Sequence, residues 1–187
     1  MNTPCAPGIY LAGPTVFFRD AEVVFANLAH QCSQQGLSPV RPAEPVDANG
    51  QLLHGAAAAR HLFGHNTLRI RAAAGVLADL QPFRNELEPD SGTVFEVGFA
   101  CALGKPVAAV LPDTRDWGSR VRAVCGTGAP GPSGLAMDAR YDMLIEDFGG
   151  PLNLMLSESC RVFADVPSAL AWLARAIASG RQPCCLE

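Results

Sequence analysis

The sequence has few charged side chains and no long hydrophobic run. Only 17% of its 187 residues are charged, the formal net charge is -4, and no block of like charges stands out. Nucleic-acid surfaces and anionic membranes attract clustered basic residues, so neither partner is expected. No apolar run reaches the roughly 18–20 residues that span a bilayer, and no signal-peptide pattern opens the chain. We therefore expect a cytoplasmic protein that binds neither nucleic acid nor membrane.

The cysteines and histidines show no disulfide or metal pattern. The seven cysteines are odd in number and scattered, which argues against a disulfide framework. No Cys-x-x-Cys pair is present, and we take the spacing of His61 and His65 as coincidental. The chain also lacks a P-loop, a Gly-x-Ser-x-Gly elbow and a dinucleotide-binding fingerprint. We therefore expect neither a metal nor a cofactor.

Short apolar segments alternate with segments of helical periodicity. Strands are predicted at residues 8–13, 37–41, 75–80, 106–111 and 161–163, and helices at 20–35, 52–74, after 90, from 153 and at 168–179. This alternation is typical of a doubly wound, mainly parallel α/β sheet of about five strands with helices on both faces. We expect one domain over residues 1–187, with an irregular excursion at 113–150 and a tail at 181–187.

One carboxylate, Glu96, interrupts a helical segment that is apolar or small on nearly every face. Such a helix is usually buried, and burying a carboxylate costs free energy unless it has a partner or a use. Its neighbours on the helix, Gly92, Thr93 and Ala100, are small and leave room for a ligand. Gly98 is expected to let the helix approach a strand closely. Glu96 is therefore a candidate functional residue; the alternative is an ordinary surface glutamate.

The predicted topology indicates where a ligand would bind. Ligands of open α/β sheets bind at the carboxyl ends of the strands, near the point where the strand order reverses. The residues expected to line that crevice are Tyr10, Gly13, Asp79, Asp90 and Glu96. Two carboxyl groups with separate roles are what glycosyl transfer requires. From the residues alone, glycosyl chemistry is therefore the candidate reaction.

Several motifs, in the same order along the chain, resemble the nucleoside 2-deoxyribosyltransferase family. They are Ile-Tyr-Leu-Ala-Gly-Pro at 9–14, Pro-Phe-Arg at 82–84, Asp-Ser-Gly-Thr-x-x-Glu-x-Gly at 90–98, Gly-Lys-Pro-Val at 104–107, and Glu-Asp-Phe-Gly-Gly-Pro-Leu-Asn-Leu-Met-Leu at 146–156. The motif at 90–98 is the most specific of these. The resemblance implies a flavodoxin-like fold and transfer of a 2-deoxyribosyl group from a 2′-deoxynucleoside to another purine or pyrimidine base.

The resemblance also assigns expected roles to individual residues. Glu96 falls on the family's nucleophile, which forms a deoxyribosyl ester in a retaining double displacement. Tyr10 falls on the residue that orients the nucleophile, although a strand tyrosine could equally serve the core. Asp90 falls on an aspartate that holds the sugar hydroxyls, and it also suits a helix N-cap. These three form the predicted catalytic set.

A second set is expected to bind substrate, and it consists of Gly13, Asn66, Asp79, Asn153 and Phe17. Asn153 matches an asparagine that a neighbouring subunit supplies, so the resemblance implies a homo-oligomer built on dimers; an N-cap is its alternative role. Asn66 stands where the family has a proton-handling aspartate, which leaves Asp79 or Asp90 to take the proton. Phe17 could stack on the base or pack in the structure.

Two other functions remain open at the level of sequence. One is a hydrolase of the same fold, a 2′-deoxynucleoside 5′-monophosphate N-glycosidase, in which water resolves the glycosyl-enzyme. Those relatives carry a serine where Asp90 stands here, so a free 5′-hydroxyl is favoured. The other is a nucleoside- or nucleotide-binding module without catalysis. The joint presence of Tyr10, Asp90, Glu96 and Asn153 argues against it.

Overall fold

A five-stranded parallel sheet forms the centre of the protein, which is described here from a computed structural model over residues 5–180. The strands are β1 (Gly8–Ala12), β2 (Ser38–Val40), β3 (Gly75–Asp79), β4 (Val107–Val110) and β5 (Arg161–Phe163), and their order is β2-β1-β3-β4-β5. Every neighbouring pair is parallel. The flavodoxin-like α/β fold is therefore confirmed, and the sheet is wholly rather than mainly parallel.

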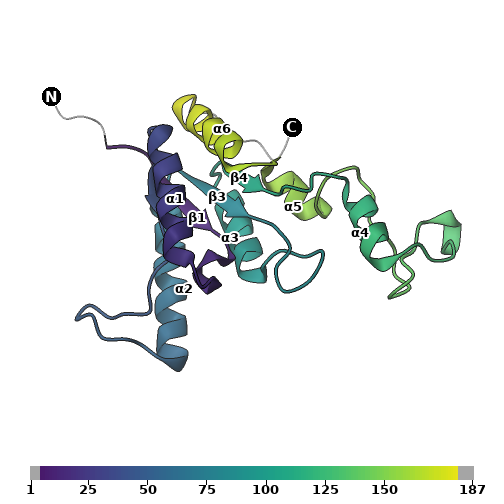
Figure 1. Cartoon of the computed structure of the whole chain (residues 1–187), viewed down its shortest axis with the longest axis horizontal. Coiled ribbons are helices and arrows are strands. Elements are labelled where there is room, and N and C mark those ends of the chain that lie inside the picture. Colours follow the sequence, from purple (N-terminus) through teal and green to yellow (C-terminus); the bar gives the residue numbers. More distant parts are fainter. Residues whose placement is uncertain (1–4, 181–187) are drawn as a thin grey trace.

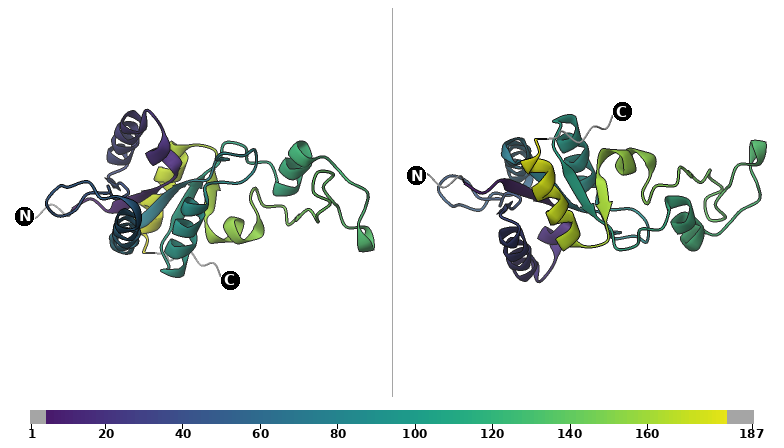
Figure 2. Two further views of the ribbon diagram at one scale, coloured as in Figure 1. Left: turned by 90° about the horizontal axis from the view of Figure 1, so that it is seen from below. Right: turned by 90° about the horizontal axis from the view of Figure 1, so that it is seen from above.

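Helices cover both faces of the sheet, as Figures 1 and 2 show. They are α1 (Ala21–Gln34), α2 (Gly55–Ala72), α3 (Ser91–Ala102), α4 (Trp117–Cys125), α5 (Leu154–Ser159) and α6 (Val166–Ala178), with short 3-10 turns η1 (Pro14–Phe17) and η2 (Pro132–Gly134). One core cluster joins the sheet to α2, α3 and α5, and the other joins it to α1 and α6. The predicted tail at 181–187 lies outside the described residues.

The alternation of side chains along the strands determines which face each residue reaches. Tyr10 and Ala78 lie in the cluster under α2 and α3, whereas Leu11 and Leu77 lie in the cluster under α1 and α6. A period of two produces this division, because successive strand residues point to opposite faces. Nearly continuous apolar strands are expected when both faces of a parallel sheet are covered.

The segment 113–150 differs from the irregular excursion that was expected. It contains the nine-residue helix α4, which Asp116 caps by accepting a hydrogen bond from the Ser119 backbone N–H at 2.7 Å. The helix is short and lies among glycines and prolines, which favour loops, so the sequence of this segment does not single it out. Both views in Figure 2 show this segment projecting away from the layered body.

Helix α3 is less buried than its apolar sequence suggests. Val97 and Ala100 are fully buried against the sheet, but Phe95 is 49% exposed and Gly98 faces open space. A methyl group added at Gly98 would meet nothing within 4 Å, so this glycine does not serve a close helix–strand approach. The prediction of an all-round buried helix was therefore wrong for one side of α3.

Candidate active site

Tyr10 and Glu96 form the centre of the candidate site. The Tyr10 hydroxyl donates a 2.6 Å hydrogen bond to Oε1 of Glu96, linking β1 to α3. Tyr10 is fully buried, and Glu96 is half-buried on the helix turn that follows the carboxyl end of β3. The bond uses one carboxylate oxygen and leaves Oε2 available for another partner. This geometry fixes the carboxyl group in one orientation.

Burial governs the electrostatics of this pair. It raises the pKa of Glu96 to about 7; the hydrogen bond from Tyr10 opposes the rise, and the nearby charge of Asp90 adds to it. Burial also raises the pKa of the Tyr10 hydroxyl well above its usual range, the Glu96 carboxylate raises it further, and the positive charge of Arg69 opposes both effects. Tyr10 is thus a permanent donor at neutral pH, and Glu96 changes charge near neutrality.

Asp90 lies six residues before Glu96 and caps α3. Its Oδ2 accepts hydrogen bonds from the Thr93 backbone N–H at 2.8 Å and from the Thr93 hydroxyl at 2.9 Å. Both of these bonds fall on Oδ2, and no group within residues 5–180 donates a hydrogen bond to Oδ1. The cap role is therefore real, and one oxygen stays open for a ligand such as a sugar hydroxyl.

Gly13 and Asp79 meet where β1 and β3 end. Asp79 lines a cavity of about 220 Å³ with Leu11, Phe25 and Thr15, under α1 rather than under α3. It follows Leu77 by two residues, so it points to the same face of the sheet, away from the face that α3 covers. Oδ1 of Asp79 accepts hydrogen bonds at 3.1 Å from the Gln81 backbone N–H and side-chain amide.

Replacing Gly13 by alanine is expected to destabilise the turn after β1. The added Cβ would lie 3.0 Å from the Asp79 Cβ, so η1 must move away from β3. We expect a loss of roughly 1–3 kcal/mol in the free energy of unfolding, measured by urea denaturation. Gly64→Ala in α2 is the control, because open space surrounds Gly64, and alanine should stabilise the helix by about 0.5–1 kcal/mol. Equal stability of Gly13→Ala and the wild type would contradict the close approach.

Asn66 and Arg69 connect α2 to the loop that follows β2. Oδ1 of Asn66 accepts a 2.7 Å hydrogen bond from the Ala43 backbone N–H, and Arg69 Nη1 donates a 2.6 Å bond to the Arg41 carbonyl. Asn66 thus holds the loop, and its substrate-binding role stays a prediction. Arg69 lines a cavity of about 570 Å³ between the loop and α2, which we call the Arg69 cavity.

The importance of Arg69 was missed at the level of sequence. It lies one helical turn after Asn66, on the same face of α2, and its charge reaches Tyr10. The spacing of three residues was the available signal. An arginine in a long, alanine-rich helix nevertheless resembles an ordinary solvated side chain.

Phe17 stacks on another phenylalanine in this structure. Its ring centroid lies 5.6 Å from that of Phe83, and the Arg84 guanidinium lies 5.3 Å from Phe17 and 4.7 Å from Phe83. Arg84 has a positive φ of 60°, a conformation that is uncommon for a residue with a side chain. Phe17 remains 59% exposed, so its predicted role in stacking on a base stays open.

Asn153 lies at a different place from the Tyr10–Glu96 pair. It caps α5 by accepting a 3.2 Å hydrogen bond from the Leu156 backbone N–H through Oδ1. It lines a cavity of about 480 Å³ together with Glu88, Glu146 and Trp117. Burial raises the pKa of Glu88, Arg120 opposes the rise and Glu146 adds to it. Its predicted role in a neighbouring subunit's site stays a prediction.

Between residues 5 and 180, no group of three or more His, Cys, Asp or Glu side chains is arranged to hold a metal ion. No helix in that same range is long and apolar enough to cross a membrane.

The sheet order and the glutamate at its edge define an α/β protein of flavodoxin-like topology with a carboxylate-centred site. The family model described as nucleoside 2-deoxyribosyltransferase matches residues 9–155. The chain therefore belongs to the nucleoside 2-deoxyribosyltransferase family, and the resemblance of its motifs to that family is confirmed.

Known proteins agree with this assignment. A 2-deoxyribosyltransferase from Leishmania mexicana is 32% identical and matches with a TM-score of 0.67, over 90% of this chain and 97% of that one. A conserved protein from Enterococcus faecalis shares the fold, with 19% identity, a TM-score of 0.51 and coverage of 94% and 99%. An uncharacterised Schizosaccharomyces pombe protein is 30% identical over 117 residues, which span 63% of this chain and 56% of the yeast protein. The family and the Leishmania structure support a deoxyribosyltransferase-like enzyme.

Proposed function

We propose that this protein transfers the 2-deoxyribosyl group of a 2′-deoxynucleoside to another nucleobase. The observation that carries the proposal is the bond between Tyr10 and Glu96. It holds a partly desolvated carboxylate at the carboxyl edge of a parallel sheet, where ligands of this fold class bind. A carboxylate whose pKa lies near 7 is a stronger nucleophile than one at the ordinary value, and about half of it is ionised at neutral pH.

The reaction would proceed by double displacement. Oε2 of Glu96 attacks C1′ of the donor, the bond from C1′ to the base nitrogen breaks, and its electron pair leaves with the base. A second base then attacks C1′ from the original side and releases Glu96, so the two inversions give net retention. Asp90 holds the sugar hydroxyls through its open oxygen. The departing base takes its proton from a donor other than Asn66, because an amide is no acid at neutral pH.

We place the nucleobase in the Arg69 cavity. Arg69 supports this placement because it lines the cavity and its charge also reaches Tyr10. The cavity wall carries both a donor and acceptors, namely Arg69 on α2 and Glu44 and Asp47 on the loop. The ring nitrogens and exocyclic groups of a nucleobase are themselves hydrogen-bond donors and acceptors, so they can pair with these side chains.

The decisive experiment mixes purified protein with deoxyinosine or thymidine and adenine, and follows the products by chromatography. We expect deoxyadenosine to appear. Without acceptor, mass spectrometry should find one deoxyribosyl group attached to Glu96. Base release without a new nucleoside would instead indicate the hydrolase, and no reaction with any donor would indicate a binding module.

We further propose that the active form is a homo-oligomer built on dimers, in which Asn153 completes a neighbour's site. An exposed apolar ridge supports this: Phe63 on α2 and Phe95 on α3 are 61% and 49% exposed, and their ring centroids are 5.9 Å apart. Gly98 lies beside Phe95 on the same open side of α3. Contiguous exposed apolar surface of this kind is typical of association sites.

Phe95→Glu is expected to convert the oligomer into monomers and to abolish transfer, because it places a charge in the centre of the ridge. Light scattering on a sizing column measures the mass, and the chromatographic assay measures transfer. Val23→Glu is the matched control, since Val23 is an exposed apolar residue on α1, which lies against the other face of the sheet. A fully active monomer, or an unchanged oligomer, would refute the role of the ridge.

A further inference from the structure

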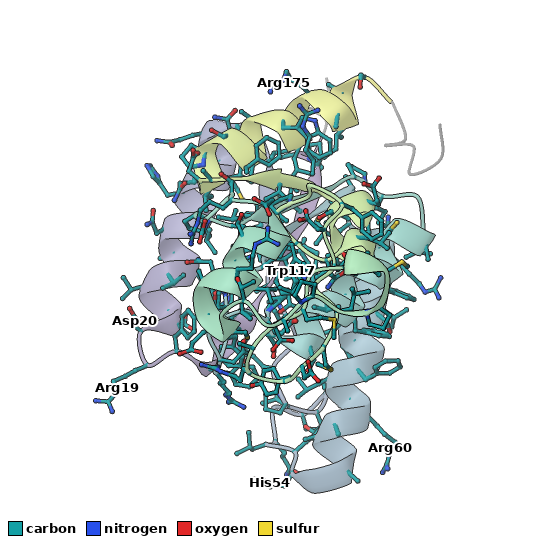
Figure 3. All side chains as sticks on the ribbon, turned by 90° about the vertical axis from the view of Figure 1, so that its right-hand side faces the viewer. Arg19, Asp20, His54, Arg60, Trp117 and Arg175 are labelled. Atoms are coloured by element: carbon teal, nitrogen blue, oxygen red, sulfur yellow. The ribbon has the colours of Figure 1, made fainter. Side chains whose placement is uncertain are left out.

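Arg120 is a buried cation that the proposed reaction does not use. It belongs to α4, and it is only 3% exposed. Its Nη1 donates a 2.9 Å hydrogen bond to the Pro151 carbonyl, and its Nη2 donates a 3.4 Å bond to the Leu87 carbonyl. Nε lies 3.9 Å from Oδ2 of Asp113, and the guanidinium lies over the Trp117 ring at 5.5 Å. Trp117, the first residue of α4, is labelled in Figure 3.

The two carbonyls belong to segments that carry candidate sugar-binding residues. Leu87 is three residues before Asp90, which caps α3, and Pro151 is two residues before Asn153, which caps α5. A further bond ties α4 to the second segment, because the Trp117 backbone N–H donates to the Gly150 carbonyl at 2.7 Å. One guanidinium therefore joins the approaches to both residues.

We propose that Arg120 is a positioning residue for sugar recognition, and this inference rests on the proposed function. It holds the loop before Asp90 and the segment before Asn153 at a fixed separation. Asp90 is thereby held in position for a sugar hydroxyl in its own subunit's site, and Asn153 for a sugar hydroxyl in the neighbouring subunit's site.

The chemistry of the guanidinium suits this task. Its planar fork of donors reaches two carbonyls at once, which a lysine ammonium on a flexible stem does less well. Burial lowers the pKa of Arg120, and the neighbouring Asp113 carboxylate opposes that effect. Asp113 itself is held mainly by Arg115, through bonds of 2.9 and 2.6 Å, so it does not depend on Arg120 for a partner. Removing the guanidinium leaves the carbonyls of two partly buried residues, Leu87 and Pro151, without this donor.

The first test compares donors that differ in one sugar hydroxyl. For the wild type, Arg120→Ala and Arg120→Lys, the ratio of kcat/KM for deoxyinosine to that for 2′,3′-dideoxyinosine is measured, with adenine as acceptor. We expect the ratio to fall about tenfold in Arg120→Ala, as when roughly one hydrogen bond to a charged group is lost, and to recover partly in Arg120→Lys. A general loss of folded enzyme would reduce both rates equally and leave the ratio unchanged.

The control is Arg122→Ala. Arg122 lies on the same helix and pairs with Asp147 at 3.4 Å, but it is more exposed than Arg120 and contacts neither carbonyl. Its ratio should equal that of the wild type. An unchanged ratio in Arg120→Ala, or an equal fall in Arg122→Ala, would overturn the role of Arg120 in sugar recognition.

A second measurement does not depend on activity. Amide hydrogen exchange of residues 85–93 and 150–157 should become faster in Arg120→Ala, in both segments together, and stay unchanged in Arg122→Ala. If only one segment or neither changes, Arg120 does not hold the two together. If the wild-type protein transfers no deoxyribose, the proposed function fails, whereas the exchange data still decide whether this side chain joins the segments.

Discussion

Glu96→Gln is expected to lower kcat for deoxyribosyl transfer by at least about 10³-fold, since an amide cannot form the glycosyl ester. Glutamine keeps an oxygen that accepts the hydrogen bond from Tyr10, so the site should retain its shape. Donor binding, measured by calorimetry, should therefore remain close to that of the wild type. Transfer at a wild-type rate by this variant would remove Glu96 from the nucleophile's role.

The same substitution is expected to stabilise the protein at alkaline pH. Folding raises the pKa of Glu96 from 4.5 to about 7, so the folded state holds this proton more tightly than the unfolded chain. The Glu96 carboxyl group therefore does not destabilise the protein below pH 4.5. The free energy of unfolding decreases as the pH rises from 4.5 to 7. At pH 8 the glutamine variant should exceed the wild type by roughly 2–3 kcal/mol in the free energy of unfolding.

Urea denaturation at pH 4 and pH 8 measures this difference. At pH 4 both proteins carry a neutral group at position 96, so their stabilities should agree. The thermodynamic and kinetic results are independent of each other, because unfolding requires no substrate. A variant that is less stable than the wild type at pH 8 would contradict a net cost of burying the Glu96 carboxylate.

Tyr10→Phe is expected to lower kcat at pH 7 by about 10–100-fold. The hydroxyl donates to a partly desolvated carboxylate, and a bond of this kind contributes roughly 1.5–3 kcal/mol. Because that bond lowers the pKa of Glu96, its removal should move the acidic limb of the pH–rate profile to higher pH. Part of the lost activity should return as the pH is raised from 7 to 9.

The profile of kcat against pH shows whether the Tyr10 hydroxyl acts on Glu96 or the Tyr10 ring only fills the core. A phenylalanine that merely loosened the core would lower kcat at every pH and leave the limb in place. Tyr141→Phe is the control, since Tyr141 is the other tyrosine of the chain and is 61% exposed. A limb that stays in position in Tyr10→Phe would show that the hydroxyl does not tune Glu96.

The sheet could be predicted because each strand is recognisable from its own short, apolar sequence. Apolar segments such as Gly75–Asp79 and Val107–Val110 are buried on both faces, so their composition alone identifies them. The predicted topology brings Tyr10 and Glu96 to the same crevice at the strand ends. That Tyr10 orients Glu96 was predictable only through the resemblance to the family.

The remaining features depend on tertiary packing. Asp79 stands at the expected edge of the sheet, yet the strand's period of two turns its carboxylate towards the cavity under α1. One side of α3 is exposed because no other element of residues 5–180 covers it. The sequence of α3 alone does not show which elements will pack against the helix. Arg120 looks like any arginine on a short helix until Leu87 and Pro151 are folded against it.

The bond between Tyr10 and Glu96 also has a consequence for folding. It joins residues 86 positions apart in the chain, so it requires that β1 and α3 come together. Contacts between such distant residues are slow to form because a long loop must close first. A partly folded chain therefore lacks the oriented carboxylate that we propose as the nucleophile. During refolding, catalytic activity should therefore return later than helical content. The return of activity would mark the time at which the fold is complete.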